Sequence, residues 1–144
     1  MSGFLLDTNV VSELIKPRPE PRVQQWVDST DENLLYLSVL TLGEVRKGIA
    51  ALSSASRKAS LEAWLNNDLI LRFAGRILSI DQEVADRWGS ITGKAITAGL
   101  FLSVIDGLLA ATAMHLNLTL VTRNTKDVAA TGVAVLNPWS TQSP

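Results

Sequence analysis

Phe4-Leu5-Leu6-Asp7-Thr8-Asn9, near the start of the chain, is a short apolar run that ends on a carboxylate. The run from Gly3 to Leu6 does not alternate between apolar and polar residues, which is typical of a strand buried on both faces. Asp7 then follows the carboxyl end of that strand, where open α/β sheets hold their ligands. Apolar residues at helical spacing come next, so Asp7 is either the cap of a helix or a ligand.

The rest of the chain alternates between short apolar segments and longer segments with helical periodicity. Strands are predicted at residues 3–6, 34–38, 77–80, 118–122 and 133–136, and helices at residues 10–15, 23–27, 41–48, 58–73, 81–98 and 103–114. This alternation favours a three-layer α/β/α fold, in which helices cover both faces of a central, mainly parallel sheet of four to five strands. Residues 1–144 are expected to form a single domain.

Capping residues mark several of the predicted helix ends. Thr41, Asp81 and Ser103 are the expected N-caps of the helices that follow them. Glu44 lies three residues after Thr41, which is the spacing of a capping box. Gly99 is expected just past the end of the helix that begins after Asp81, where a left-handed backbone conformation is common.

Composition excludes several classes of site. The chain has no cysteine and a single histidine, His115, which excludes disulfides and thiolate chemistry and argues against a zinc site. A net charge of −1 does not indicate nucleic-acid binding, so such a role would depend on local charge. No apolar run approaches the ~18 residues of a membrane span, and a cytoplasmic protein without membrane association is expected.

Three more acidic residues occupy positions comparable with that of Asp7. Glu44 follows the second predicted strand, Asp127 follows the fourth, and Asp106 lies in the first turn of the helix that precedes the fourth strand. Because parallel strands end at one edge of a sheet, these carboxylates are expected to meet there.

Each carboxylate also has a purely structural interpretation. Asp7 can cap a helix, Glu44 can complete a capping box, Asp106 can favour the helix dipole, and Asp127 can form an Asx turn. A cluster of four is different, because like charges a few ångströms apart either take up protons or need a cation. Oxygen ligands without histidine or cysteine select Mg²⁺ or Mn²⁺, and Mg²⁺ held by carboxylates suits phosphodiester hydrolysis.

Four motifs, taken together and in order, resemble those of PIN-domain ribonucleases. They are Leu5-Leu6-Asp7-Thr8-Asn9, Thr41-Leu42-Gly43-Glu44, Ile105-Asp106 before an alanine-rich helix, and Leu120-Val121-Thr122-Arg123-Asn124 leading to Asp127. The resemblance covers essentially the whole chain. It is closest to VapC-type toxins of bacterial type II toxin–antitoxin pairs, including the FitB-like branch, whose chains often end in a segment similar to Asn137-Pro138-Trp139.

The resemblance implies a PIN-like fold and an endoribonuclease that depends on Mg²⁺ or Mn²⁺. The implied site has three core metal ligands that are also catalytic, Asp7, Glu44 and Asp106. A fourth acidic residue, Asp127, has the same implied role. The polar residues that would orient ligands or water are Thr8, Asn9, Thr122 and Asn124. Asn124 is also an alternative to Asp127 as the fourth contact.

The resemblance also implies partners for the chain. Members of this family are commonly homodimers that a small DNA-binding antitoxin holds inactive, in heterotetramers or hetero-octamers that reach operator DNA only through the antitoxin. We expect the antitoxin on the first two helices and on the helical hairpin that the helices predicted at 41–48 and 58–73 form, because the apolar stripes of these helices exceed what a small sheet can cover.

An RNA substrate must approach an acidic site, so nearby cations matter more than net charge. Arg46, Lys47, Arg123 and Lys126 flank the predicted ligands and are candidates for phosphate contacts, although each can also be an ordinary solvated charge. Trp26, Trp64 and Trp88 lie at apolar helical positions and are predicted to pack in the core.

A second interpretation uses the same fold without catalysis. Fold and motif do not prove turnover, so the chain can instead be a binding component of a DNA-bound toxin–antitoxin repressor. Metal-dependent cleavage of RNA distinguishes the two interpretations.

Overall fold

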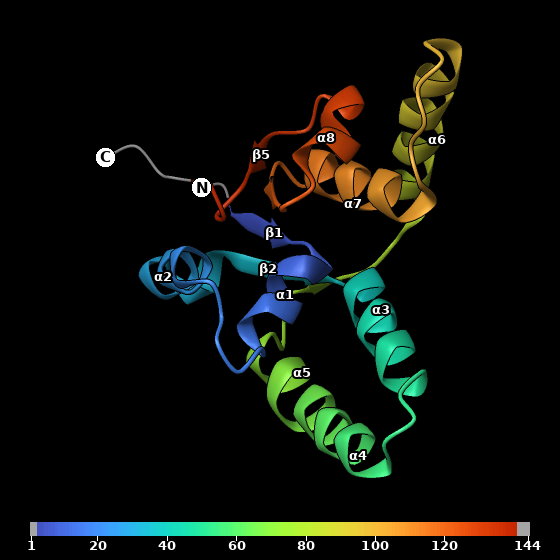
Figure 1. The fold of residues 1–144 in the computed structure, drawn as a ribbon. Helices are drawn as coiled ribbons and strands as arrows, with labels where there is room; N and C mark the ends of the chain where they lie inside the picture. Colours follow the sequence, from blue (N-terminus) through green and yellow to red (C-terminus); the bar gives the residue numbers. More distant parts are fainter. Residues whose placement is uncertain (1–2, 141–144) are drawn as a thin grey trace.

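The structure is a computed structural model that describes residues 3–140, and its centre is a parallel sheet of five strands (Figure 1). The strands are β1 (Phe4–Leu6), β2 (Leu35–Ser38), β3 (Ile77–Leu78), β4 (Thr119–Val121) and β5 (Val135–Leu136). Their order across the sheet is β3-β2-β1-β4-β5. Phe4 of β1 pairs with Leu35 on one side and with Thr119 on the other, which makes β1 the central strand. The predicted parallel sheet is confirmed.

Helices cover both faces of this sheet, so the predicted three-layer α/β/α arrangement is also confirmed (Figure 1). One layer contains α1 (Thr8–Leu14), α2 (Pro21–Ser29), α3 (Val39–Ala50), α4 (Ala55–Trp64) and α5 (Ile70–Arg72). The other contains α7 (Val104–His115) and α8 (Thr125–Val128), with α6 (Gln82–Thr97) packed against α7. The segment predicted as one helix at 58–73 is α4 and α5, which are joined by a wide π-helical turn at Leu65–Leu69.

Neighbouring strand residues point to opposite faces of the sheet and build two separate cores. Leu6 and Val121 pack with α1 to α5, whereas Leu5 and Leu120 pack with α7. The alanines of α7 are fully buried, and their small side chains bring this helix close to the sheet. Trp26, Trp64 and Trp88 all pack against these or a third apolar cluster, as predicted from their helical spacing.

The start of α3 differs from the prediction. Ser38, the last residue of β2, is the N-cap of α3, and its hydroxyl accepts a hydrogen bond from the Leu40 amide at 3.0 Å. The predicted capping box of Thr41 and Glu44 is therefore wrong. Both residues lie inside the helix, because the chain turns out of the sheet directly after the strand.

The other predicted caps are confirmed. Asp81 accepts a hydrogen bond from the Val84 amide, and Ser103 accepts one from the Asp106 amide. Gly99 follows α6 with a φ of +73°, the left-handed conformation that glycine adopts without strain. Among residues 3–140, no helix is both long and apolar enough to cross a membrane.

A buried carboxylate holds the proline-containing segment that follows α1. Glu13 accepts hydrogen bonds from the Lys16 ammonium at 2.9 Å and from the Glu20 amide at 3.0 Å. These contacts, with a smaller contribution from the Trp139 side chain, keep the pKa of Glu13 below its usual value. Glu13 therefore connects α1, the proline segment and the end of the described chain.

Candidate metal and catalytic site

Sheet order brings the predicted acidic residues to one edge of the molecule. Asp7 follows the central strand β1, Glu44 lies in the helix that follows β2, and Asp127 lies in α8 after β4. Because β2, β1 and β4 are neighbours, the segments at their carboxyl ends lie side by side. Asp106 lies in the first turn of α7, which packs against β4.

Charge interactions connect Asp7 with Asp106 and Glu44, and Asp106 with Asp127 and Glu44. The pKa of Asp7 is raised first by burial and then by the charges of Asp106 and Glu44, although hydrogen bonds from Thr122 and Thr8 oppose the shift. The pKa of Asp106 is also raised by burial and by the charges of Asp127 and Glu44. The structure therefore brings together all four acidic residues that the sequence singled out.

The raised pKa of Asp106, caused first by burial and then by the neighbouring charges, predicts a pH-dependent effect of removing its charge. Because the folded state raises the pKa of Asp106 above 3.8, it binds this proton more tightly than the unfolded chain does. This proton stabilises the folded state fully when the pH is below the unfolded-state pKa of Asp106. The stabilisation is lost as the pH rises through the folded-state pKa. Asp106→Asn should therefore raise the melting temperature in EDTA, and the difference from the parent should grow between pH 4 and pH 7. The exposed Asp86→Asn is the matched control, and a shift equal at both pH values would contradict the expectation.

Two polar side chains and one backbone amide donate hydrogen bonds to the Asp7 carboxylate, and Asp7 is only 8% exposed. One oxygen accepts a hydrogen bond from the Thr8 amide at 2.7 Å, so Asp7 caps α1. The other accepts hydrogen bonds from the Thr122 hydroxyl at 2.8 Å and from the Asn9 side chain at 3.4 Å. Asp7 is thus both a helix cap and a member of the acidic cluster, and the two interpretations of the sequence are compatible.

The Thr8 hydroxyl links α1 to the second carboxylate. It donates to the Glu44 carboxylate at 2.5 Å and lies 3.3 Å from the hydroxyl of Thr41. Thr41 is fully buried, and sequence reasoning assigned it to a cap. Its place could have been found from helical periodicity, since Thr41, Val45 and Ile49 recur every four residues and share the inner face of α3.

The donor chemistry of the cluster fits a hard divalent cation, since every candidate ligand offers a carboxylate oxygen or, for Asn124, an amide oxygen. In this conformation, however, no three acidic or histidine side chains of residues 3–140 lie close enough together to ligate one ion. Glu44 is instead hydrogen bonded to Thr8. For these acidic side chains to ligate one ion together, they must move closer to one another. The carboxylates repel each other as they approach, and the bound cation would neutralise that repulsion.

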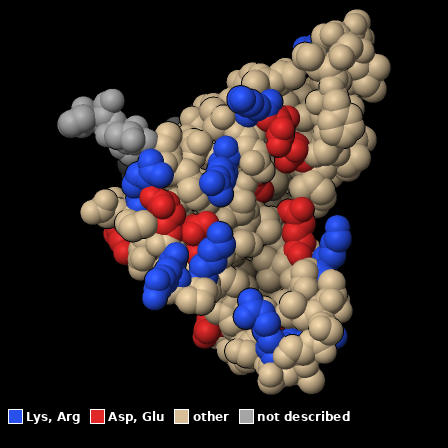
Figure 2. Space-filling model, in the orientation of Figure 1, with Lys and Arg blue, Asp and Glu red and all other residues tan. Residues whose placement is uncertain are grey.

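The four candidate RNA-binding cations have different surroundings. The Arg46 guanidinium donates to the Glu62 carboxylate at 3.3 Å and to the Asn66 side chain at 3.1 Å, so it connects α3, the first arm of the helical hairpin, to the second arm. Arg123 lies over the ring of Trp139, and Lys47 and Lys126 are exposed. Figure 2 shows Lys and Arg side chains interspersed with Asp and Glu side chains on one face of the molecule.

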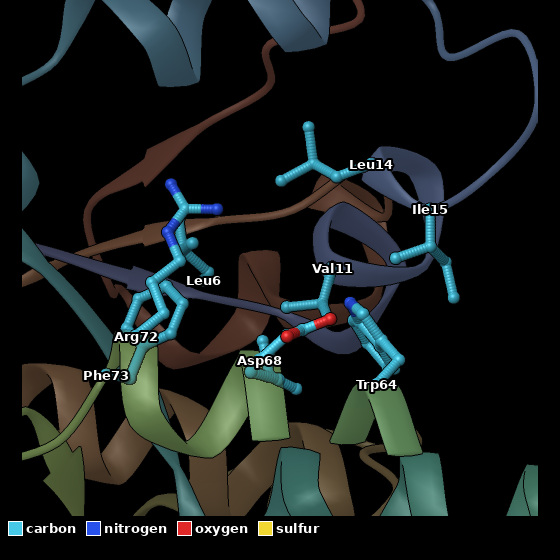
Figure 3. A pocket seen from close by; sticks show the side chains of 9 residues that line it. Leu6, Val11, Leu14, Ile15, Trp64, Asp68, Arg72 and Phe73 are labelled. Atoms are coloured by element: carbon cyan, nitrogen blue, oxygen red, sulfur yellow. The ribbon is translucent and has the colours of Figure 1, made fainter. Parts of the chain in front are cut away.

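An apolar pocket lies between α1 and the continuous α4–α5 segment, which is the second arm of the helical hairpin, apart from the acidic cluster (Figure 3). Its volume is about 200 Å³. The lining is mainly apolar, from α1, β1 and the hairpin, with Asp68 and Arg72 as its charged members. Arg72 makes two hydrogen bonds of 2.9 Å to Glu32, whereas Asp68 forms no ion pair within residues 3–140.

Comparison with known proteins identifies the family of this fold. Residues 4–132 match the PIN domain. The chain belongs to the PIN-domain family. This PIN domain is 43% identical over 136 residues to Toxin FitB of Neisseria gonorrhoeae. The matched residues cover 94% of this chain and 98% of the relative. It is 35% identical to VapC ribonuclease Y4jK of Sinorhizobium fredii, with 94% of this chain and 97% of the relative covered.

Solved structures agree with this assignment. The fold superposes with a TM-score of 0.92 on a chain from the structure of FitAB bound to an IR36 DNA fragment, at 40% identity and with 97% and 98% of the two chains covered. The resemblance to the FitB-like branch of VapC-type toxins, which the sequence motifs indicated, is thereby confirmed.

Proposed function

We propose that this PIN domain is a metal-dependent endoribonuclease, the toxin of a type II toxin–antitoxin pair. The observation that carries the proposal is the position of Asp7, Glu44, Asp106 and Asp127 on neighbouring elements at the carboxyl edge of the sheet, where hydrogen bonds orient Asp7 and Glu44. Such a cluster of carboxylates is unfavourable unless a cation binds or protons are taken up. The names of relatives such as VapC ribonuclease Y4jK support RNA as the substrate.

Asp7, Glu44 and Asp106 would hold Mg²⁺ or Mn²⁺, with Asp127 or Asn124 as the fourth contact. When bound, the ion would polarise a phosphoryl oxygen and lower the pKa of a water molecule that attacks the phosphodiester. Thr122 and Asn9 fix the orientation of the Asp7 carboxylate, and Thr8 fixes that of Glu44. Arg46, Lys47, Arg123 and Lys126 are the proposed contacts to RNA phosphates.

The proposed activity is tested by incubating purified protein, freed of any partner, with total cellular RNA. Reactions contain Mg²⁺, Mn²⁺ or EDTA. We expect discrete products with either metal and intact RNA with EDTA. Failure to cleave in any condition, by protein that circular dichroism shows to be folded, would favour a non-catalytic binding component of a DNA-bound repressor complex. This second candidate function is supported by the similarity to a chain in the structure of FitAB bound to a DNA fragment.

The apolar pocket between α1 and the hairpin supports a small antitoxin as the partner (Figure 3). An amphipathic helix fits such a site, because its apolar face fills the pocket and its polar face stays in water. Asp68 would favour a partner with a basic residue at that position. We propose that operator DNA is contacted only through this antitoxin, and that the complex is cytoplasmic.

A homodimer is the proposed assembly of the toxin itself, and an exposed apolar patch is its proposed interface. The patch consists of Ile96, Leu100, Phe101 and Val104, between the end of α6 and the start of α7, and Phe101 is 88% exposed. Val104, the last residue of the patch, lies two residues before Asp106, so a second copy bound there would be close to the acidic cluster. Patches of this kind commonly mark interfaces between proteins.

Phe101→Glu is therefore expected to convert the dimer into a monomer, since two like charges would face each other at a desolvated interface. Light scattering coupled to size-exclusion chromatography measures the mass. The control is Leu71→Glu, at an exposed position on α5. A dimer that persists in Phe101→Glu would exclude this patch as the interface.

A further inference from the structure

Trp139, near the end of the described residues, packs in the apolar core that includes Leu6 and Val10. Trp139 is only 8% exposed, and its amide donates to the Asn137 side chain at 2.9 Å. Its side chain contributes to the lowered pKa of Glu13, after the larger effects of Lys16 and the Glu20 amide. Pro138 beside it is buried as well. The Asn-Pro-Trp segment is therefore fixed in place by contacts on several sides.

This fixed tryptophan carries a cation. The guanidinium carbon of Arg123 lies 5.4 Å from the centre of the Trp139 ring, within the range of a cation–π interaction. Within residues 3–140, the guanidinium group makes no ion pair or hydrogen bond of its own. This distinguishes Arg123 from Arg46, whose guanidinium already donates to Glu62 and Asn66.

The backbone of Arg123 belongs to the network around Asp7. Arg123 directly follows Thr122, which donates to the Asp7 carboxylate, and its amide donates to the Asn9 side chain at 3.5 Å. The cation is thus fixed at its backbone by the site and at its side chain by the end of the chain. A guanidinium held over an aromatic ring retains its N–H groups for two parallel hydrogen bonds to a phosphate.

We propose that Trp139 is a positioning residue that holds Arg123 ready to bind an RNA phosphate beside the acidic cluster. The inference rests on the proposed ribonuclease function and adds to it a role for the Asn-Pro-Trp segment. Holding the arginine in advance lowers the entropy that is lost when the phosphate binds. It also supplies positive charge at an edge where four carboxylates would repel the substrate.

The test measures RNA binding in an Asp7→Asn background, so that the probe is not cleaved. Fluorescence anisotropy follows a fluorescein-labelled, mixed-sequence single-stranded RNA at several salt concentrations with Mg²⁺ present. Arg123→Gln should weaken binding and reduce the slope of log K against log salt by about 0.7, the effect of one lost phosphate contact on a single strand. Trp139→Leu should weaken binding by about 3- to 10-fold, whereas Trp139→Phe should restore most of the affinity.

The double variant separates positioning from general stability. If Trp139 acts through Arg123, Trp139→Leu should have no further effect once Arg123→Gln is present. Trp26 is another tryptophan that packs against the same core, so Trp26→Leu is the control for loss of aromatic packing. This variant should bind RNA like the parent. Thermal unfolding monitors the fold of each variant.

The outcomes distinguish this inference from the proposed function. If the parent binds no RNA and cleaves none, the proposed function fails and the inference fails with it. If the parent binds RNA and Trp139→Leu binds equally well, only the inference is overturned. An equal loss from Trp139→Leu with and without Arg123 would also overturn it, because the tryptophan would then act through the fold alone.

Discussion

Asp7→Asn is expected to lower metal-dependent RNA cleavage by about 10³-fold or more, since loss of one ligand removes several kcal/mol of charge stabilisation in the transition state. Asparagine keeps the size of the side chain and an oxygen that can still accept the hydrogen bond from the Thr8 amide. The fold should therefore persist while the charge is lost. Cleavage rates at saturating Mg²⁺, with circular dichroism spectra of both proteins, measure the effect.

The matched control for this experiment is Asp86→Asn on the exposed surface of α6. It removes the same charge far from the network of Asp7, Thr8 and Thr122, and it should cleave RNA at the parental rate. An Asp7→Asn protein that is folded and still fully active would exclude Asp7 as a ligand. It would leave the acidic cluster without a demonstrated role in catalysis.

Ile15→Glu is expected to weaken binding of the antitoxin by 100-fold or more. Ile15 lines the pocket between α1 and the hairpin and is 40% exposed, so a charge there is tolerated in the free protein. In the complex the new carboxylate would be covered by an apolar helix face without a partner, which costs several kcal/mol. Isothermal titration calorimetry with the purified product of the adjacent gene, the expected antitoxin, measures the change.

The control is Leu116→Glu, which introduces the same charge at a position with 44% exposure at the end of α7. It lies on the opposite face of the sheet and should leave the affinity for the antitoxin unchanged. Equal affinity of Ile15→Glu and the parent would show that the antitoxin does not occupy this pocket. Equal losses in both variants would indicate a general effect of added negative charge.

Strand positions and the meeting of the acidic residues could be predicted because both depend on local patterns and one rule of sheet geometry. Uninterrupted apolar runs predicted the strands to within a few residues, and parallel strands must end at a common edge. The position of Asp106 followed from Ser103, since a helix that starts at its cap has its third residue in the first turn.

Other features depend on contacts between elements far apart in the sequence. Ser38 and Thr41 both precede plausible helix starts, and the choice between them depends on how soon the chain leaves the sheet. The hydrogen bond from Thr8 to Glu44 depends on how α3 is rotated toward α1. The pairing of Arg46 with Glu62 likewise needs the register of the hairpin, which no local pattern determines.

The central position of β1 has a consequence for the synthesis of the protein. The Asp7 carboxylate leaves the ribosome well before the Thr122 hydroxyl that orients it, which lies 115 residues later in the chain. β4, which pairs with β1, and α8, which carries Asp127, are made after the elements that carry Asp7, Glu44 and Asp106. A nascent chain therefore carries an unassembled site until these two elements have been synthesised, and the cell meets a complete site only after that point.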